Sequence, residues 1–321
     1  MIFLENSKEK INSLVENVES VIVGKRKVVE KISAALISGG HVLLEDVPGV
    51  GKTIMVRALA KSLGCSFKRI QFTPDLLPSD ITGVSVFNQK TGDFEFKAGP
   101  VMNQIILADE INRTSPKTQS SLLEVMEEHQ VTADGKTYSL KKPFMVLATQ
   151  NPIEYEGTFP LPEAQLDRFM MKISIGYPVE DEEKAILRRF KTENPIDSLK
   201  EVLTSDDILE IQDDVKKIYV DDSIDDYIIN IVRATRNNPD ILLGASPRGS
   251  LALFRVSQAW AIINGREYVL PDDVKNLAKS VLGHRLIVKP EVKLRGITSD
   301  DIMSNILGQV HIPIVRRYVQ V

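Results

Sequence analysis

A glycine-rich loop followed by lysine and threonine is the part of this chain whose residue types most clearly predict chemistry. The run Gly-Val-Gly-Lys-Thr at 49–53 follows apolar Val-Leu-Leu at 42–44, a predicted buried strand, and precedes a predicted helix over 54–60. Glycines let backbone N–H groups approach phosphate oxygens, and the positive end of the next helix faces the same anion. Lys52 would neutralise the β- and γ-phosphates, and the Thr53 hydroxyl would hold Mg²⁺. The loop therefore predicts a nucleoside triphosphate site.

One position departs from the strict form of this loop. That form begins with a glycine where this chain has Asp46. An ordinary glycine-rich turn in front of a helix is the alternative interpretation of residues 49–53. Further residues elsewhere in the chain are needed to decide between the two.

Two adjacent acids provide the second candidate feature. Asp109 and Glu110 end a predicted apolar strand over 104–110. An acid at the end of a buried strand beside a phosphate loop can hold Mg²⁺ through water, and its neighbour can orient and polarise the attacking water. Two solvated acids at a strand end are the alternative. Their combination with the phosphate loop favours the catalytic interpretation.

Three polar residues further along the chain could complete such a site. Asn151 follows a predicted strand over 143–150, where its amide could bind the attacking water or the γ-phosphate; a turn-forming Asn-Pro pair is the alternative. Arg168 lies late in a short predicted helix, and a solvated side chain or a pair with Asp167 is the alternative. Arg248 falls in the first turn of a predicted helix, where a cation opposes the helix dipole. The sequence therefore predicts an anion in front of Arg248.

The elements that must position these residues follow from the hydrophobic pattern. Strands and helices alternate through the first half of the chain, which predicts a parallel sheet with helices on both faces. Two insertions have hairpin character, one with strands 84–88 and 93–97 and one that pairs Val131 with Tyr138. The predicted helices outside the sheet region cover 7–20, 25–38, 180–191, 205–218, 222–236, 246–264 and 271–281. We therefore expect an α/β core over 1–178 and a helical domain over 179–321.

Composition places limits on the class of protein. At 321 residues the chain is long enough for two domains, each with its own core. A hydrophobic content of 43% and a charged content of 26% are typical of a globular protein, and no apolar run has the length of a membrane span. Cys65 has no partner for an internal disulfide, which fits a reducing compartment and a buried structural thiol. Because charged residues interrupt the apolar N-terminus, we expect no signal peptide and a cytoplasmic location.

Several stretches resemble the MoxR family of AAA+ ATPases. They are Leu-Leu-Glu-Asp-Val-Pro-Gly-Val-Gly-Lys-Thr at 43–53, Leu-Ala-Asp-Glu-Ile-Asn-Arg at 107–113, Ala-Thr-Gln-Asn-Pro at 148–152, the run at 156–169 that contains Arg168, and Ser-Pro-Arg at 246–248. The resemblance covers essentially the whole chain, and Asp46 is usual for this family. It implies an α/β fold: a P-loop core with a parallel five-stranded sheet flanked by helices, followed by a C-terminal all-helical lid domain.

The resemblance also implies roles for individual residues, with ATP and Mg²⁺ as cofactors. Thr53 and Asp109 would serve the metal, Glu110 would activate water, and Asn151 would be sensor 1. Arg168 would be the arginine finger that reaches the γ-phosphate of a neighbouring subunit. The role of Arg113 is not defined by the resemblance, and a solvated charge is an adequate account of it.

The remaining implied roles concern nucleotide contacts and the lid. Arg248 would be sensor 2, contributed by the lid, so that bound nucleotide would set the angle between core and lid. Contacts to ATP are implied for the phosphate loop and for the segment whose backbone meets adenine, namely Val47, Pro48, Gly49, Val50, Gly51, Lys52, Thr53, Val23 and Gly24.

The resemblance implies ATP hydrolysis in a homo-oligomeric ring, expected to be a hexamer, with the two hairpins facing a central pore. The family remodels or matures partner proteins in a chaperone-like way, often partners with a von Willebrand factor A domain. A nucleic-acid-translocating or helicase-like motor is the alternative, which Lys136, Lys141 and Lys142 keep open. The net charge of −4 weighs against nucleic acid. A non-catalytic nucleotide-gated scaffold is disfavoured by the intact set of candidate residues, and a GTPase by the lack of an Asn-Lys-x-Asp motif.

Overall fold

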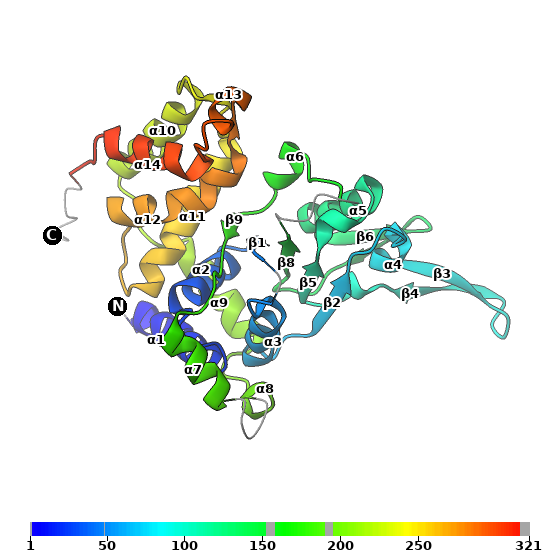
Figure 1. Ribbon diagram of the computed structural model, residues 1–321. Helices are drawn as coiled ribbons and strands as arrows, with labels where there is room; N and C mark the ends of the chain where they lie inside the picture. The colour runs from blue at the N-terminus through cyan, green and yellow to red at the C-terminus, as the bar shows by residue number, and fades with distance from the viewer. Residues whose placement is uncertain (1, 48, 152–157, 190–194, 315–321) are drawn as a thin grey trace.

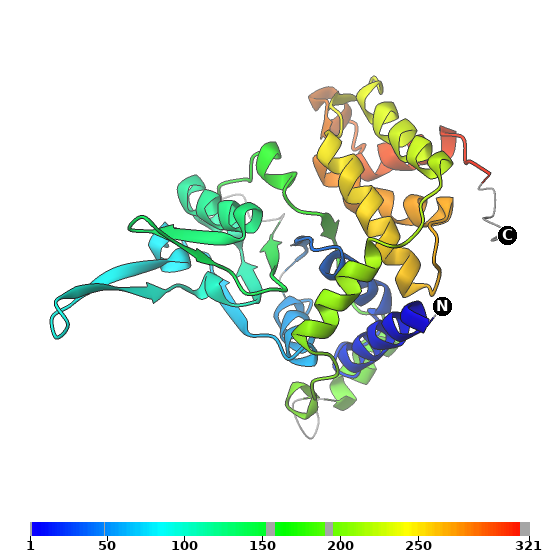
Figure 2. The same cartoon turned by 180° about the vertical axis from the view of Figure 1, so that it is seen from behind.

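The computed structural model describes residues 2–47, 49–151, 158–189 and 195–314, with the side chains of residues 2–4 left aside. A central parallel sheet has helices on both faces, and a group of helices from the C-terminal half packs beside it (Figures 1 and 2). The strands of the sheet are β1 (Val42–Glu45), β2 (Phe67–Gln71), β5 (Ile105–Asp109), β8 (Met145–Gln150) and β9 (Met171–Ile173).

The sheet has the order β2-β5-β8-β1-β9, and all neighbouring strands are parallel. The predicted five-stranded parallel sheet is confirmed, although the pattern did not locate β9, which is only three residues long. β1 lies between β8 and β9, with Val42 opposite Met171. Because all five strands run in one direction, their carboxyl ends meet at one edge and their amino ends at the other.

The central strands are buried on both faces, as their continuous apolar sequences require. Alternate residues enter two different hydrophobic clusters. Leu44 and Leu107 join the cluster that includes α1 (Ile2–Glu19), α2 (Arg26–Ile37) and α3 (Lys52–Ser62). Leu43 and Ile106 join the cluster on the other face, which includes α5 (Pro116–Glu128) and α4 (Pro78–Thr82).

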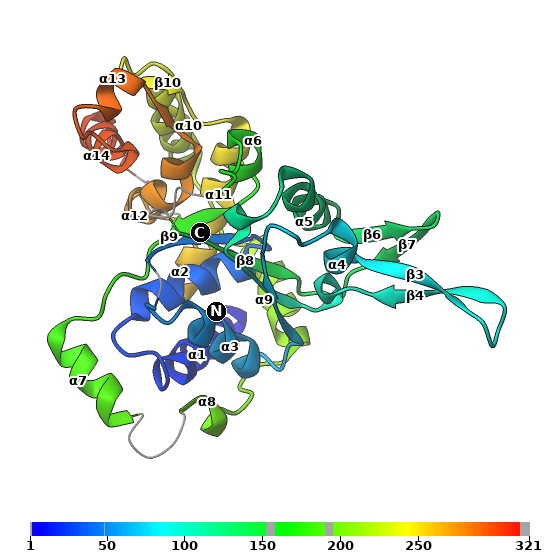
Figure 3. The ribbon, with the colours of Figure 1, turned by 45° about the vertical axis from the view of Figure 1, so that its right-hand side comes forward.

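Both predicted hairpins are present. Strands β3 (Gly83–Asn88) and β4 (Asp93–Ala98) form an arm that extends away from the body, and β6 (Gln130–Ala133) pairs with β7 (Lys136–Ser139) beside it (Figure 3). Val131 lies opposite Tyr138, as predicted. The rings of Phe96 and Tyr138 stack with centroids 4.2 Å apart, so the two hairpins contact each other through an aromatic pair that the sequence did not reveal.

The C-terminal half is mainly helical. The predicted helices are confirmed with small shifts at their ends, except that the predicted end of the helix over 180–191 lies outside the described residues. Short helices, a C-terminal helix and a small ribbon are added. The elements are α6 (Glu163–Leu166), α7 (Glu180–Arg189), α8 (Pro195–Ser198), α9 (Ser205–Val215), α10 (Asp222–Arg236), β10 (Ile241–Leu243), α11 (Pro247–Ile263), α12 (Pro271–Leu282), η3 (Gly283–Arg285), β11 (Ile287–Val288), α13 (Pro290–Lys293) and α14 (Ser299–Gln309), with η1 (Pro100–Met102) and η2 (Ile111–Arg113) in the core.

Two of these additions correct the expectation from sequence. The antiparallel pair β10–β11 means that this half is not made of helices alone. Strands of two and three residues are too short to produce a periodic signal. Helix α14 begins with a capping box formed by Thr298 and Asp301, a signal that is present in the sequence.

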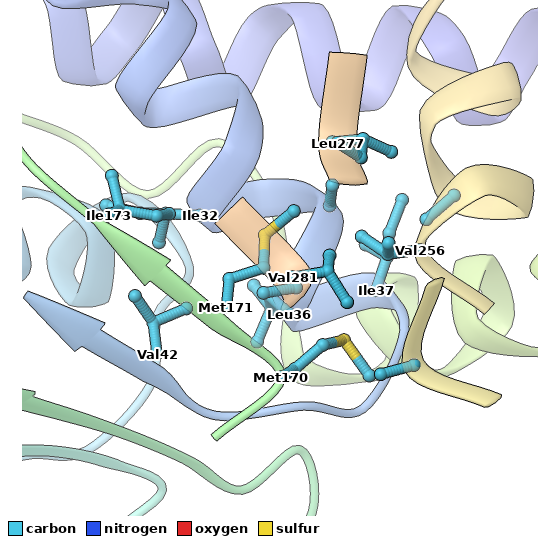
Figure 4. Close-up of a cluster of buried hydrophobic side chains, with 14 of the residues drawn as sticks. Ile32, Leu36, Ile37, Val42, Met170, Met171, Ile173, Val256, Leu277 and Val281 are labelled. Carbon is cyan, nitrogen blue, oxygen red and sulfur yellow. The ribbon is translucent and has the colours of Figure 1, made fainter. Parts of the chain in front are cut away.

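The two halves share a hydrophobic core. α9 packs on the N-terminal helices, where the Lys10 ammonium lies 2.7 Å from an Asp207 carboxylate oxygen and the Ser7 hydroxyl donates to Asp214 over 2.8 Å. Figure 4 shows Val256 and Val281 of the C-terminal helices near residues of α2 and β9 in one apolar cluster. The expected boundary at 178/179 therefore does not separate two independent cores, although it remains a proposal as a division of the chain.

Two compositional expectations concern the described residues directly. Cys65 is a free, buried thiol, as predicted, and burial raises its pKa. No helix in the described part of the chain has the length and apolar character that a membrane crossing requires.

Candidate nucleotide-binding site

A cleft of about 350 Å³ lies at the carboxyl edge of the sheet. Parallel strands bring together the residues that follow β1, β5 and β8, although these residues are far apart in sequence. The cleft is lined by Gly49, Gly51, Lys52, Thr53, Ile54, Arg69, Asp109, Glu110, Thr149, Gln150 and Asn151. The structure thus brings together the phosphate loop, the two acids and the amide that the sequence singled out.

The phosphate loop has the backbone geometry that its glycines predict. Gly49 and Gly51 have φ angles of +87° and +88°, values that side-chain-bearing residues rarely adopt. Gly51 is the N-cap of α3, so the first N–H groups of that helix face the cleft. The Lys52 ammonium donates to the carbonyl oxygens of Asp46 (2.7 Å) and Val47 (3.1 Å). Burial lowers the pKa of Lys52, while nearby acids oppose that shift.

Asp46, the departure from the strict motif, has a structural role. Its carboxylate accepts hydrogen bonds from the Ser174 hydroxyl (3.2 Å) and from the backbone N–H groups of Ile175 and Gly176. These contacts join the start of the phosphate loop to the segment that leaves β9. Asp46 does not adopt a positive φ, so this position does not require glycine. Pro48 lies outside the described residues.

Asp109 is held by two neighbours. The Thr149 hydroxyl donates to Asp109 Oδ1 over 2.6 Å, and the Arg69 guanidinium donates to Oδ2 from Nε (2.9 Å) and Nη2 (2.6 Å). Arg69 comes from the edge strand β2, opposite Leu107 of β5. A magnesium ion bound by Asp109, directly or through water, would therefore have to share this carboxylate with Arg69.

The donor atoms fit a magnesium ion held largely by phosphate and water. The Thr53 hydroxyl and the Asp109 carboxylate both line the cleft and are hard oxygen donors. Within the described residues no group of three or more His, Cys, Asp and Glu side chains could hold a metal without further ligands. An ion at this site would complete its coordination with nucleotide phosphates, as Mg²⁺ usually does.

Glu110 has an unusual backbone and a fixed carboxylate. Its φ and ψ of 59° and 49° are in the left-handed region, which non-glycine residues adopt mainly at functional or tightly held positions. Its N–H donates to the Thr149 hydroxyl over 2.9 Å, and the Gln71 amide donates to Oε2 over 2.8 Å. Arg113 Nε also lies 3.3 Å from Oε2. Arg113 is therefore paired with the candidate water-activating acid, and the expectation of a purely solvated charge is wrong.

An apolar pocket of about 270 Å³ adjoins the cleft and shares Gly49, Gly51 and Ile54 with it. Its other lining residues are Val21, Ile22, Val23, Lys25, Val50, Pro178 and Ile186. An apolar slot beside a phosphate loop suits a purine base. Val23 and Val50 are part of this lining, whereas Gly24 and Val47 are not.

Arg168 and Arg248 do not lie in the cleft. Arg168 precedes β9 and lies at the amino edge of the sheet, separated from the phosphate loop by the length of β1, about 13 Å for its four residues. There the Glu127 carboxylate bridges both guanidiniums: Arg168 Nη2 lies 3.0 Å from one oxygen, and Arg248 Nη2 contacts the other. Glu127 is the anion predicted in front of Arg248.

The predicted position of Arg248 requires a correction. The resemblance implied that Arg248 senses the nucleotide from the lid, but the structure places it beside Arg168 and outside the cleft. The reason is the anchoring of α11: Ser246, its N-cap, donates its hydroxyl to Asp167 over 2.8 Å. Asp167 in turn pairs with Arg285 and not with Arg168.

Comparisons with known proteins agree with this geometry. The profile of the "ATPase family associated with various cellular activities (AAA)" matches residues 41–171, and that of the "AAA lid domain" matches residues 233–306. Over 94% of this chain and 82% of its own length, "Chaperone MoxR1" of Mycobacterium tuberculosis is 41% identical. The chain belongs to the MoxR family of AAA+ ATPases.

Another relative and a solved structure extend the match along the whole chain. An uncharacterised protein of Bacillus subtilis, YeaC, is 53% identical over the full length of both chains. A crystal structure of a Cytophaga hutchinsonii protein provisionally classed as an ATPase is 44% identical, covers 97% of both chains and has a TM-score of 0.91. The fold is therefore that of an AAA+ core followed by an AAA lid.

Four residues of the site were missed by sequence reasoning: Arg69, Gln71, Glu127 and Thr149. Arg69 and Gln71 alternate on β2, and Gln71 lies opposite Asp109. Two polar residues at alternate positions near the end of a predicted strand could have indicated side chains directed at the acids of the neighbouring strand. Glu127 offered no such signal, because its partners, Arg168 and Arg248, are distant from it in sequence.

Proposed function

We propose that this MoxR-family protein hydrolyses ATP in a homo-oligomeric ring, with each site completed by an arginine from the adjacent subunit. The single observation that carries this proposal is the separation of the two parts of the site. The cleft contains the phosphate loop and acids, while Arg168 lies at the opposite edge of the sheet, where it cannot serve its own cleft. A hexamer is the ring size proposed from the family resemblance.

The residues of the cleft have defined tasks in this proposal. Backbone N–H groups of the loop and Lys52 bind the phosphates, while Thr53 and Asp109 would hold Mg²⁺. When bound, the ion would neutralise the charge that develops on the phosphoryl oxygens. Glu110 accepts a proton from the attacking water, and Asn151 orients that water or the γ-phosphate.

Arg168 and Arg248 form a pair whose spacing suits an oxyanion. One carboxylate receives both guanidiniums, one on each oxygen, so two oxygens of a phosphoryl group could take its place. We propose that the γ-phosphate of the neighbouring subunit displaces Glu127 when the ring forms. Under this proposal Arg248 acts between subunits, together with Arg168.

The work driven by hydrolysis is proposed to be chaperone-like remodelling or maturation of partner proteins, including those with a von Willebrand factor A domain, in the cytoplasm. The name of the M. tuberculosis relative supports a chaperone role. A nucleic-acid motor is the alternative that an experiment must separate. ATPase stimulation by DNA or RNA that weakens with salt would favour the motor.

Mixed rings test the proposal. Arg168→Ala should lower turnover by about 10³–10⁵-fold, and Glu110→Gln should bind ATP without turnover. An equal mixture should recover activity, because a Glu110→Gln subunit lends its arginine to an Arg168→Ala subunit with an intact acid. Arg233→Ala, which removes an exposed arginine of α10, is the control and should behave as the wild type. A mixture no more active than its separate components would contradict catalysis between subunits.

A further inference from the structure

The segment that carries Arg168 is held by the lid. Arg285 belongs to η3 of the lid, and its side chain is only 3% exposed. It donates from Nε to Asp167 Oδ1 over 2.7 Å and from Nη2 to the backbone carbonyl oxygen of Phe169 over 2.7 Å. Nη1 and Nη2 also donate to the carbonyl oxygens of Met170 (3.3 Å) and Asp167 (3.2 Å). Four of its five hydrogen bonds therefore end on residues 167–170.

Other lid contacts converge on the same segment. The Ser246 hydroxyl occupies the second oxygen of Asp167, so both carboxylate oxygens receive lid donors. His284 Nε2 lies 3.0 Å from the Phe169 carbonyl oxygen. Figure 4 shows Val281 of α12 near Met171, the first residue of β9. The backbone on both sides of Arg168 is thus fixed by the lid.

The pattern of acceptors distinguishes this arrangement from an ordinary buried ion pair. A single carboxylate would balance the charge of Arg285. The guanidinium nevertheless also donates hydrogen bonds to three backbone carbonyl oxygens of the short segment 167–170. A planar guanidinium with five donors can fix several acceptors at once, whereas an ammonium cannot reproduce that geometry. Arg285 is too deeply buried to reach a neighbouring subunit itself.

We propose that Arg285 is a positioning residue for Arg168, through which the lid sets the arginine offered to the neighbouring subunit. This inference rests on the proposed catalysis between subunits. It assigns the effect of Arg285 to the donor side of each interface, because Arg285 is not among the residues that line the subunit's own cleft. A subunit with an altered Arg285 should still bind ATP and still accept an arginine from its neighbour.

The test uses Arg285→Lys, which keeps the charge opposite Asp167 but loses the planar set of donors. Turnover of the homogeneous ring should fall by up to about 10²-fold, the effect of misplacing a catalytic group by about 1 Å. Affinity for a fluorescent ATP analogue should remain within about twofold of wild type. Arg266→Lys is the matched control, because Arg266 pairs with Asp273 inside the lid (2.6 Å) and has no hydrogen bond to residues 167–170 among those observed.

Mixed rings separate positioning from general damage to the fold. Arg285→Lys mixed with Glu110→Gln should regain activity, whereas Arg285→Lys mixed with Arg168→Ala should not, because both partners lack a working donor. Recovery in the second mixture, or normal turnover of Arg285→Lys alone, would overturn the inference.

Two further outcomes complete the experiment. If Arg168→Ala recovers with Glu110→Gln but Arg285→Lys does not, the positioning role is wrong while the proposed function stands. If Arg168→Ala does not recover, the proposed function fails and this inference falls with it. Should thermal melting show that Arg285→Lys does not fold, Asp167→Asn takes its place in the same two mixtures, and recovery with Arg168→Ala again overturns the inference.

Discussion

Replacing Arg69 by methionine should strengthen the response of this protein to Mg²⁺. Arg69 places two N–H groups on Asp109 Oδ2, at 2.9 and 2.6 Å, and Asp109 is the proposed acid for the metal. The guanidinium and the ion therefore compete for one carboxylate. Methionine keeps much of the length of the side chain and removes the competing charge.

The exposure of the two partners sets the size of the effect. The Arg69 side chain is 47% exposed and that of Asp109 is 10% exposed, so the pair is intermediate between a surface and a buried ion pair. Solvent-exposed pairs contribute about 0.2–1 kcal/mol, and the buried carboxylate favours the upper end of that range. About 1 kcal/mol corresponds to a roughly fivefold lower Mg²⁺ concentration at half-saturation.

The assay separates binding from turnover. Mg²⁺ is titrated against a fluorescent ATP analogue in the Glu110→Gln background, with and without Arg69→Met. Lys68→Met, on the same strand, removes an equal charge without an observed contact to Asp109 and should leave the titration nearly unchanged. The difference should shrink at high salt, because a half-exposed pair is screened. An unchanged or higher half-saturation concentration for Arg69→Met would refute the competition.

Three other predictions address the loop, the acid and the sheet edge. Lys52→Ala should abolish measurable ATP binding in equilibrium titrations, and unchanged affinity would refute the phosphate-loop assignment. Gln71→Ala removes the 2.8 Å bond to Glu110 and should change kcat more than affinity; equal changes in both would indicate a binding role instead. Burial lowers the pKa of His41 to about 4 from 6.5, and Nδ1 accepts from the Val146 N–H in the neutral ring. Because the unfolded chain takes the proton first as pH falls, this residue should cost about 2–3 kcal/mol of stability between pH 7 and 4.5, measured by urea unfolding. His41→Gln should flatten that loss, and an equally steep loss in the variant would show that other groups cause it.

Much of the cleft could be predicted from the sequence because its residues follow directly from strand ends. Gly51, Lys52, Asp109 and Asn151 lie at the ends of predicted apolar strands or in the loops that follow them, and the carboxyl ends of parallel strands meet at one edge. The hairpin pairing of Val131 with Tyr138 followed from a two-residue turn, whose length fixes the register. Strand ends and hairpin register both depend on residues that are close in sequence, so a single sequence is enough to predict them.

Other features depended on packing between distant segments. Asp46 matches no strict motif, yet its carboxylate joins the phosphate loop to the segment after β9. The stacked rings of Phe96 and Tyr138 require two separate hairpins to lie side by side.

The sequence by itself determined the phosphate loop, the adjoining acids and the alternation of strands and helices, because each depends on neighbouring residues and on periodicity. Only the tertiary structure decided at which edge of the sheet Arg168 and Arg248 lie. Their positions depend on the lid, where Ser246 and Arg285 bind both oxygens of Asp167. Contacts between residues about 80 to 120 positions apart leave no periodic trace in a single chain, since they are fixed by the packing of whole elements.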